Sequence, residues 1–513
     1  MNTDRTEAAD AEAVLSVDPV VEKAREIFGI KYLYPYQRLA VHNILGACGL
    51  WEDEEADAAP GDQIILLPTG AGKSLCFQLP AAILPGITLV IYPLLSLMSD
   101  QKRRLDGANI ASRVLRGGQE KPEREAVWAD LAAGKVKLLI TNPETLGGRE
   151  VLRRCADIGV RHLVIDEAHC IAEWGQTFRP SYLELGKIRA ELKPSATTAF
   201  TATASAPILE GIITHLFNGK KPHIIAGNPD RPNISYQVIP VLSKDEALMD
   251  VLRQAEKPAL VFCSSRKGTE MTARYLRRRL GHREVFFYHA GLEREEKKAV
   301  EQWFFASRDG VLCATCAYGM GVDKADIRAV IHRDIPGSVE AYLQESGRGG
   351  RDGKPAAAIL LTGSRDTPGA GDHAQAPERR AAMLAYAHSR SCRRSFLLSL
   401  LGAQTESCEG CDVCDGCAQR SAREEKIILD FIRKNPRRFT TAEAALILCG
   451  ARGARARGSA YTGRRGFGSL SSWEEAGIGE AIEELLRGGK LKRHTGFLFR
   501  GKLAPRGRTL ERE

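Results

Sequence analysis

Two successive blocks of short apolar runs constrain the fold of this 513-residue chain more than any other feature of its sequence. In each block, the runs are rich in β-branched residues and alternate with stretches of helical pattern. The runs are residues 63–67, 88–92, 137–141, 161–165 and 197–201, then 259–263, 284–288, 311–315, 328–332 and 356–361. Runs this short and uniformly apolar fit strands that are buried on both faces, and intervening helices make neighbouring strands parallel. The sequence therefore predicts two consecutive α/β domains, joined near residues 227–243.

Length and composition indicate a cytosolic protein of several domains. A chain of this length exceeds what one hydrophobic core supports, and its 43% apolar and 27% charged residues are ordinary for a globular protein. The chain has no run of eighteen apolar residues, and its first eighteen residues are polar and acidic, unlike a signal peptide. We expect no membrane partner.

The residues that follow the first predicted strand are typical of a phosphate-binding loop. They run Leu-Pro-Thr-Gly-Ala-Gly-Lys-Ser at residues 67–74 and open a predicted helix. Glycines let successive backbone N–H groups approach phosphates, the lysine reaches the β- and γ-phosphates, and the serine hydroxyl binds Mg²⁺. The motif usually begins with glycine where this chain has Leu67, and a glycine-rich turn that binds nothing is the alternative. The predicted binding residues are Thr69, Gly70, Gly72, Lys73 and Ser74.

A pair of carboxylates follows a later strand of the first block, in the run Val-Ile-Asp-Glu-Ala-His at residues 164–169. Two carboxylates at the end of a buried strand are costly unless a cation sits beside them. Asp166 is expected to hold Mg²⁺ through water, and Glu167 to orient and deprotonate the attacking water. With Lys73, they predict hydrolysis of a nucleoside triphosphate.

The second block carries two arginines on a glycine-rich turn, in the run Gln-Glu-Ser-Gly-Arg-Gly-Gly-Arg at residues 344–351. Arg348 and Arg351 belong to a different domain from Lys73, so they are predicted to act across a cleft on the transition-state charge of the γ-phosphate. An exposed basic loop without this role is the alternative.

These motifs resemble those of superfamily 2 helicases and, within them, the RecQ family, over roughly residues 28–361 and on through a later group of cysteines. The resemblance implies two tandem RecA-like domains and the use of ATP. The further matching segments are residues 92–101, 141–146, 200–204, 262–266, 288–292 and 314–324.

The segment most diagnostic of RecQ proteins is the aromatic-rich run at residues 169–182, directly after the carboxylates. Bases stack on aromatic faces without regard to sequence, which gains about 1–3 kcal/mol per base. Trp174 and Phe178, with Arg179, are therefore predicted to contact single-stranded DNA, and core packing is the alternative for the two rings. The family pattern for adenine recognition is only partly present, because Gln37 remains while the usual arginine and glycine are replaced in the run at residues 33–37.

A group of closely spaced cysteines predicts a metal site. Among thirteen cysteines, Cys408, Cys411, Cys414 and Cys417 are each separated by two residues, and Cys392 lies upstream. Four thiolates suit tetrahedral Zn²⁺, whereas iron–sulfur runs end with a three-residue spacing followed by proline. The RecQ resemblance implies Cys392 as the fourth ligand with Cys408, Cys411 and Cys414; spacing alone leaves Cys417 as an alternative to Cys392.

The C-terminal part is basic, because residues 421–513 hold 20 Lys and Arg against 11 Asp and Glu, an excess equal to the net charge of +9 of the whole chain. Helical patterns at residues 423–434, 440–448 and 473–487 precede a basic hairpin at residues 490–503, as in a winged helix. Lys492, Arg493 and Arg500 are predicted to contact DNA phosphates without reading sequence.

The expected domains are residues 1–226 (ATP-binding, RecA-like), 227–363 (second RecA-like), 364–420 (zinc-binding) and 421–513 (winged-helix-like). The predicted activity is ATP-dependent translocation on single-stranded DNA and unwinding of forked duplexes. The resemblance implies the 3′→5′ direction and a role in recombination and repair. The alternatives are a superfamily 2 RNA helicase, a translocase that does not unwind, and a DNA-binding scaffold without catalysis.

Overall fold

The computed structural model of the protein describes residues 18–30, 32–50, 61–68, 71–174, 179–202, 204–281, 284–318, 324–366, 377–403, 407–451 and 463–506. Residues 51–60, 367–376 and 452–462 are among those outside these ranges. The chain divides into two compact units, Met1–Pro229 and Asp230–Glu513.

The first unit is built on a sheet that has seven strands within the described ranges, and every neighbouring pair is parallel. The five strands predicted for the first block are confirmed. The two that were not predicted, β3 and β7, are short edge strands with exposed residues, so they lack the uniform apolar run of a central strand. In spatial order the strands are β3 (Ser112–Val114), β4 (Leu138–Thr141), β2 (Ile87–Ile91), β5 (Val160–Ile165), β6 (Ala196–Thr201), β1 (Asp62–Leu66) and β7 (His223–Ala226).

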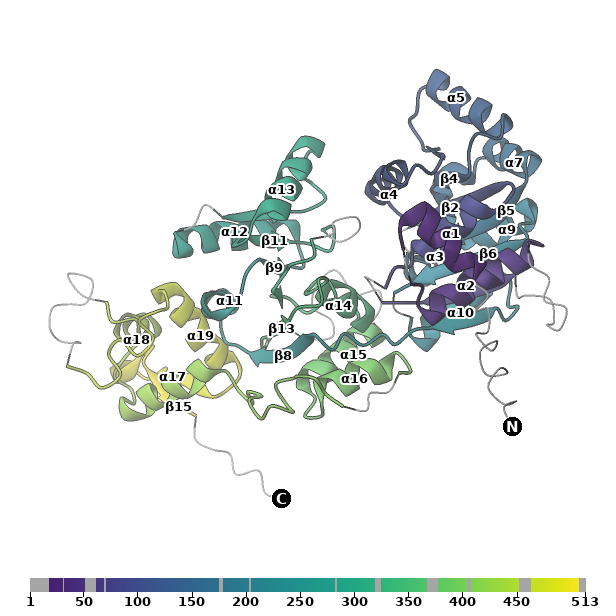
Figure 1. The fold of residues 1–513 in the computed structure, drawn as a ribbon. Coiled ribbons are helices and arrows are strands. Elements are labelled where there is room, and N and C mark those ends of the chain that lie inside the picture. The colour runs from purple at the N-terminus through teal and green to yellow at the C-terminus, as the bar shows by residue number, and fades with distance from the viewer. Residues whose placement is uncertain are drawn as a thin grey trace, which may run out of the picture. The chain divides into compact units, whose positions relative to one another are not determined.

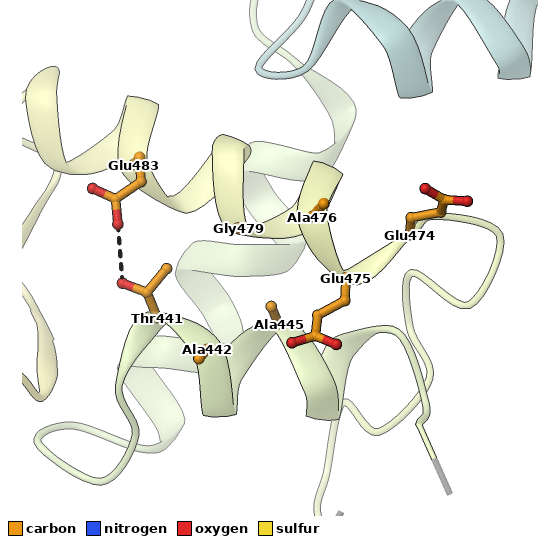
Figure 2. Close-up of a pocket in the computed structure, with 8 residues that line it drawn as sticks. All are labelled: Thr441, Ala442, Ala445, Glu474, Glu475, Ala476, Gly479 and Glu483. Carbon is orange, nitrogen blue, oxygen red and sulfur yellow. Dashed lines mark hydrogen bonds between the residues drawn. The ribbon is translucent and has the colours of Figure 1, made fainter. Parts of the chain in front are cut away.

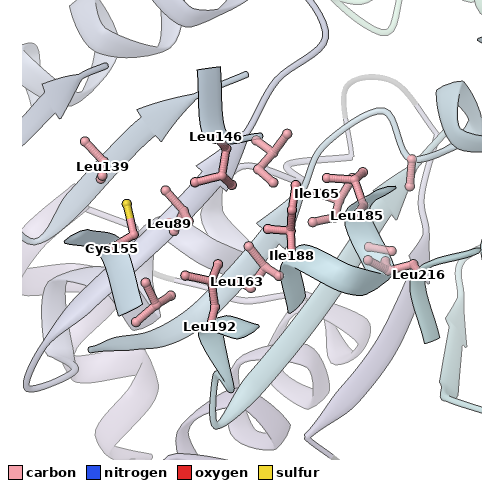
Figure 3. Packing of buried hydrophobic residues seen from close by; sticks show 14 of the residues in the cluster. Leu89, Leu139, Leu146, Cys155, Leu163, Ile165, Leu185, Ile188, Leu192 and Leu216 are labelled. Atoms are coloured by element: carbon pink, nitrogen blue, oxygen red, sulfur yellow. The ribbon is translucent and has the colours of Figure 1, made fainter. Parts of the chain in front are cut away.

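Helices cover both faces of this sheet (Figure 1). Alternate residues of each central strand therefore enter two different cores: Leu163 and Ile165 of β5 lie in one, and Val164 lies in the other. Figure 3 shows the first core, where Leu163 and Ile165 pack near Leu185 and Ile188. The helices are α1 (Pro19–Phe28), α2 (Pro35–Ala47), α3 (Leu75–Ile83), α4 (Leu95–Gly107), α5 (Lys121–Ala132), α6 (Pro143–Leu146), α7 (Arg149–Ile158), α8 (His169–Trp174), α9 (Leu185–Leu192) and α10 (Ala206–Phe217), with a 3₁₀ turn η1 (Pro180–Glu184).

The second unit contains another parallel sheet, with six strands among the residues that the structure describes. In spatial order they are β10 (Val285–Tyr288), β11 (Val311–Ala314), β9 (Ala259–Phe262), β12 (Ala329–His332), β13 (Ala356–Thr362) and β8 (Ile234–Pro240). The helices of this sheet are α11 (Lys244–Gln254), α12 (Arg266–Leu280), α13 (Arg294–Ala306) and α14 (Val339–Ser346). All five strands of the second block are confirmed.

Strand β8 lies inside the segment that was expected to join the two domains. Its residues alternate between buried and half-buried, so it has no continuous apolar run. The two units divide between Pro229 and Asp230, inside the expected join at residues 227–243, and the later part of that segment is an edge strand of the second sheet.

Two smaller parts follow the second sheet in the same unit. The cysteine subdomain consists of α15 (Pro377–His388), α16 (Arg393–Leu400) and residues 407–420. The winged-helix-like part then contains α17 (Arg423–Lys434), α18 (Thr441–Leu448), α19 (Glu475–Arg487) and the antiparallel strands β14 (Leu491–Arg493) and β15 (Leu503–Pro505), with a 3₁₀ turn η4 (Phe497–Phe499) between them (Figure 1). The predicted helices and hairpin are confirmed.

Polar contacts fix the winged-helix-like part to α11 and α12. The indole N–H of Trp473 donates to Asp250 (3.0 Å), and the buried Glu246 carboxylate accepts from the Glu474 backbone N–H (2.7 Å) and from Arg279 (3.1 Å). These contacts attach the part that contains the hairpin to the helices of the second sheet. No helix among the described residues is long and apolar enough to cross a membrane.

Candidate functional site

The carboxyl ends of the parallel strands bring the predicted nucleotide residues to one edge of the first sheet. In spatial order, β5, β6 and β1 are adjacent there, so the loops that follow β5 and β1 are separated by only one strand. Asp166 and Glu167 follow β5, and the phosphate-binding loop follows β1. Ligands of open α/β sheets bind at this edge.

The phosphate-binding loop leads directly into α3. Gly72 has φ +75°, a conformation that side-chain-bearing residues rarely adopt, and a Cβ there would meet Nε2 of Gln37 at 2.5 Å. Lys73 and Ser74 directly precede α3. The first N–H groups of a helix have no partner within the helix, which makes this position suited to an anion such as phosphate. Thr69 and Gly70 lie outside the described residues.

Gln37 fastens this loop in the structure. Its buried side chain accepts from the Tyr34 backbone N–H (3.0 Å) and donates to the Ala71 carbonyl (3.2 Å), which the Tyr36 hydroxyl also reaches (3.3 Å). The rings of Tyr34 and Tyr36 are stacked, with centroids 5.4 Å apart, and Tyr34 is half exposed. This flat aromatic surface beside the loop was missed from sequence, although the run Tyr-Leu-Tyr-Pro-Tyr at residues 32–36 contains it.

Asp166 and Glu167 have the position and the mutual repulsion that are typical of carboxylates at a cation site. The Asp166 backbone N–H donates to the Ile91 carbonyl (3.0 Å), which holds it beside β2. Burial, and then repulsion from Glu167, raise the pKa of Asp166 above its ordinary value, while Lys73 opposes the shift. A partly buried, mutually repelling pair of carboxylates fits Mg²⁺, which prefers carboxylate and phosphate oxygens. Glu167 has φ +51°, a left-handed conformation that costs on the order of 1 kcal/mol in a residue with a side chain and that is concentrated at functional sites.

His169 connects these carboxylates to the next strand. Its Nδ1 lies 3.1 Å from the Thr201 hydroxyl at the end of β6 and 3.4 Å from Glu167. The Ala168 backbone N–H also donates to the Phe200 carbonyl (2.8 Å). His169 and Ala168 therefore link the segment of Glu167 to the end of β6.

Arg179 ties together loops that follow β2 and β4. Its guanidinium donates to the Pro93 carbonyl and lies 3.8 Å from the Glu144 carboxylate, which also accepts from the Ser181 hydroxyl (3.0 Å). The structure thus gives Arg179 a positioning role, and its contact with DNA stays a prediction. The Trp174 side chain and Phe178 lie outside the described residues.

Arg348 and Arg351 lie in the second unit, on a turn after α14 that we call the arginine turn (residues 347–351). Arg348 is buried and Arg351 is half-buried. Both cations lower the pKa of the Tyr318 phenol, although burial of that ring has the larger, opposite effect. The arginine turn is therefore close to Tyr318, which follows β11.

Four cysteines converge in the cysteine subdomain. The sulfur atoms of Cys392, Cys408, Cys411 and Cys414 all lie within 4.8 Å of one another, and those of Cys392 and Cys411 are 4.0 Å apart. Sulfurs around a tetrahedral Zn²⁺, each bound at about 2.3 Å, are separated by about 3.8 Å. The four thiols therefore fit this ion, and we call them the cysteine cluster. The exposed Cys417 is not among the clustered described residues, which favours Cys392 as the fourth ligand.

The surroundings of Cys392 favour the thiolate form of its side chain. Burial alone would raise its pKa, but the hydrogen bonds of Ser395 and the neighbouring thiols lower the pKa of Cys392 to about 6. Its sulfur lies at the N-terminus of α16 and accepts from the Ser395 backbone N–H (3.5 Å). Helix N-termini stabilise thiolates, the form that binds metal ions.

The basic hairpin exposes cations and a bare apolar tip. Lys492 and Arg500 are exposed, whereas Arg493 forms an ion pair with Glu483. At the tip, Phe497 is 99% exposed and Leu498 is 84% exposed, a feature that sequence patterning did not single out.

A groove near the basic hairpin is acidic instead. Figure 2 shows it between α18 and α19, with Thr441 and small residues on its walls and glutamates along its rim. The glutamates Glu474, Glu475 and Glu483 disfavour phosphate there, so the hairpin is the better surface for a nucleic acid.

Family models match three consecutive parts of the chain. A DEAD/DEAH box helicase model matches residues 34–210, a helicase conserved C-terminal domain matches residues 243–353, and a RecQ zinc-binding model matches residues 364–415. Combined with the two parallel-sheet units, these matches make the chain a superfamily 2 helicase protein.

Sequence identity to known proteins shows which family of these helicase proteins the chain belongs to. The chain is 31% identical over 440 residues to the ATP-dependent DNA helicase RecQ of Bacillus subtilis, covering 82% of this chain and 73% of that one. It is 37% identical over 360 residues to RecQ of Pasteurella multocida and 35% identical over 401 residues to RecQ of Haemophilus influenzae, covering 68% and 76% of this chain. The chain belongs to the RecQ family. It spans 56% and 63% of the lengths of the latter two relatives.

Solved structures support the fold. The helicase MrfA bound to DNA aligns with a TM-score of 0.55 at 17% identity, covering 96% of this chain and 63% of that chain. The Mycobacterium smegmatis helicase Lhr bound to single-stranded DNA and AMP-PNP aligns with a TM-score of 0.52 at 21% identity, covering 71% of this chain and 52% of that chain.

The cysteine cluster yields a test with a matched control. Because Cys411 is buried within the cluster, Cys411→Ser is expected to lose the bound metal and to lower the melting temperature. Cys417→Ser is expected to keep one zinc per chain. Metal content by atomic emission and thermal unfolding measure both effects. Equal zinc loss in the two variants would contradict the ligand set.

Proposed function

We propose that the protein is an ATP-dependent DNA helicase, which hydrolyses ATP at the carboxyl edge of the first sheet and uses the energy to move on and unwind DNA. The observation that carries this proposal is the convergence of the phosphate-binding loop with Asp166 and Glu167 at that edge, in a chain of the RecQ family. Relatives at 31–37% identity are named ATP-dependent DNA helicases.

Within the first unit, each residue has a distinct part in hydrolysis. Lys73 binds the β- and γ-phosphates, and the Ser74 hydroxyl and Asp166 hold Mg²⁺. Bound Mg²⁺ would neutralise the phosphate oxygens as charge develops on them. Glu167 orients the attacking water and takes its proton. Gln37 reads the adenine edge once it exchanges one of its bonds to Tyr34 or Ala71 for the base, and the stacked rings of Tyr34 and Tyr36 offer a flat surface for that base.

Arg348 and Arg351 act from the second unit on the γ-phosphate. Such arginines stabilise the charge of the transition state and raise the rate by about 10³–10⁵. Because they belong to a separate unit, hydrolysis depends on how the two units move, which couples the chemistry to translocation.

DNA binds over several elements in this proposal. Trp174 and Phe178 stack on single-stranded bases, and Arg179, which contacts Pro93 and Glu144, binds the strand beside them. Lys492, Arg493 and Arg500 contact the phosphates of a forked duplex. The exposed Phe497 and Leu498 are suited to pack against the last base pair. The cysteine cluster holds zinc and stabilises its subdomain.

The proposed direction is 3′→5′, with a role in recombination and repair, as in the RecQ resemblance. A superfamily 2 RNA helicase and a translocase that does not unwind are the main rivals, and the names of the relatives favour DNA. A scaffold without catalysis is disfavoured because Lys73, Asp166 and Glu167 are all present at one sheet edge.

Hydrolysis is tested first at the loop and the carboxylate. Lys73→Ala and Glu167→Gln are each expected to lower DNA-stimulated ATP hydrolysis by at least about 10²-fold, because each removes a group that acts on the transferred phosphate or the attacking water. Lys187→Ala, at an exposed lysine on α9 whose partner is Glu184, is the control and is expected to retain the wild-type rate. Unchanged hydrolysis in Lys73→Ala would refute the assigned site.

Unwinding and direction are tested on duplexes with a single-stranded tail. We expect ATP-dependent strand separation of DNA with a 3′ tail, little with a 5′ tail, and weaker stimulation of hydrolysis by RNA than by DNA. Separation with the 5′ tail alone would reverse the direction. Stimulated hydrolysis without separation of either substrate would make the protein a translocase.

A further inference from the structure

A guanidinium at the start of the second unit holds the backbone of the arginine turn. One terminal nitrogen of Arg231 donates to the Gly347 carbonyl (3.0 Å), and the other donates to the carbonyls of Gly349 (3.0 Å) and Gly350 (2.9 Å). Three carbonyls of one turn thus converge on one planar side chain. A guanidinium is suited to this arrangement because its N–H groups have fixed directions.

Asn233 closes the same turn from the same side. Its amide nitrogen donates to the carbonyls of Gly350 (2.8 Å) and Lys354 (2.8 Å). Gly350 has φ +55°, and a Cβ there would meet the Asn233 amide nitrogen at 2.4 Å. The turn therefore has little room to move toward Arg231 and Asn233.

The position of Arg231 has an electrostatic cost that its contacts must offset. Burial and the nearby cation of Arg351 both lower the pKa of Arg231. A cation placed beside another cation is unfavourable unless other groups stabilise it. The carbonyls at the end of α14 supply that stabilisation, because the C-terminal end of a helix carries partial negative charge.

The cysteine subdomain fixes the segment that carries Arg231. Arg394, which is only 1% exposed, donates to the backbone carbonyls of Arg231 (3.0 Å) and Ile234 (2.6 Å) and pairs with Asp230. Arg394 lies on α16, two residues after Cys392 of the cysteine cluster. A continuous set of contacts therefore runs from this subdomain to the arginine turn.

We propose that Arg231 is a positioning residue for ATP hydrolysis, which sets the arginine turn while Arg394 anchors Arg231 to the cysteine subdomain. This inference rests on the proposed function, in which Arg348 and Arg351 act on the γ-phosphate. Arg231 itself faces the backbone of the turn, so it acts through those two arginines. A displacement of about 1 Å at a reacting group costs on the order of 10²-fold in rate.

The experiment compares Arg231→Gln and Arg231→Lys with Arg328→Lys in the full-length protein. Arg328 is the control: its guanidinium likewise donates to backbone carbonyls, those of Asp326 and Pro355, and pairs with the Asp352 carboxylate, but none of these acceptors is in the arginine turn. DNA-stimulated kcat, KM for ATP and the melting temperature are measured for each variant.

We expect Arg231→Gln to lower kcat by about 10- to 100-fold while KM for ATP changes less than about threefold, because the phosphate-binding loop is in the other unit. Arg231→Lys is expected to recover part of kcat, since an ammonium reaches some of the carbonyls without the fork geometry. Arg328→Lys is expected to lower the melting temperature without lowering kcat. An equal loss of kcat in Arg328→Lys and Arg231→Lys would overturn the inference, because it would indicate general loosening.

A combined variant separates this inference from the proposed function. Once Arg348→Ala and Arg351→Ala together have removed the two groups that Arg231 positions, adding Arg231→Gln is expected to lower kcat by less than about threefold further. A full additional loss would show that Arg231 acts by another route. Should Arg348→Ala and Arg351→Ala leave kcat unchanged, the proposed function fails; should they lower it while Arg231→Gln does not, only the role of Arg231 fails.

Discussion

The need to neutralise a partly buried pair of carboxylates governs the first unit. Asp166 and Glu167 directly follow a central strand, where they are partly buried and repel each other, and burial raises the pKa of Asp166. The nearby Lys73 offsets part of that charge, and a divalent cation with its bound triphosphate would offset the rest. In this unit the site forms where neighbouring parallel strands end together. The parallel order of the sheet is therefore a condition for the chemistry.

Contacts around this pair extend in two directions. His169 joins Glu167 to Thr201 on the neighbouring strand end, and Arg179 contacts both Pro93 after β2 and Glu144 in α6. A change at the nucleotide therefore has a physical route to the loops proposed to hold single-stranded DNA. In the second unit, the contacts of Arg231 give the arginine turn a comparable support.

Much of the fold could be predicted because uniformly apolar runs report strands buried on both faces. The misses have the opposite character: β3, β7 and β8 are edge strands with exposed or alternating residues. The phosphate-binding loop, the carboxylate pair and the cysteine group could be predicted because their functional residues lie close together in the sequence at characteristic spacings. Spacing did not choose between Cys392 and Cys417, because only folding brings the distant Cys392 to the cluster.

Hydrogen bonds between residues that are far apart in the sequence could not be predicted from it. Arg231 and the arginine turn are more than one hundred residues apart, and no local pattern joins a guanidinium to backbone carbonyls that far along the chain. The exposed Phe497 was missed for a related reason, since an aromatic residue in a hairpin is equally consistent with packing inside a small core.

The central claim is that one triphosphate is held by Lys73 and Glu167 from the first unit and by Arg348 and Arg351 from the second. The most direct measurement is a crystal structure of the protein with Mg²⁺, a non-hydrolysable ATP analogue and single-stranded DNA. The account predicts a guanidinium of Arg348 or Arg351 within about 3.5 Å of a γ-phosphate oxygen. Both arginines turned away from the nucleotide, with the two units closed on DNA, would contradict it.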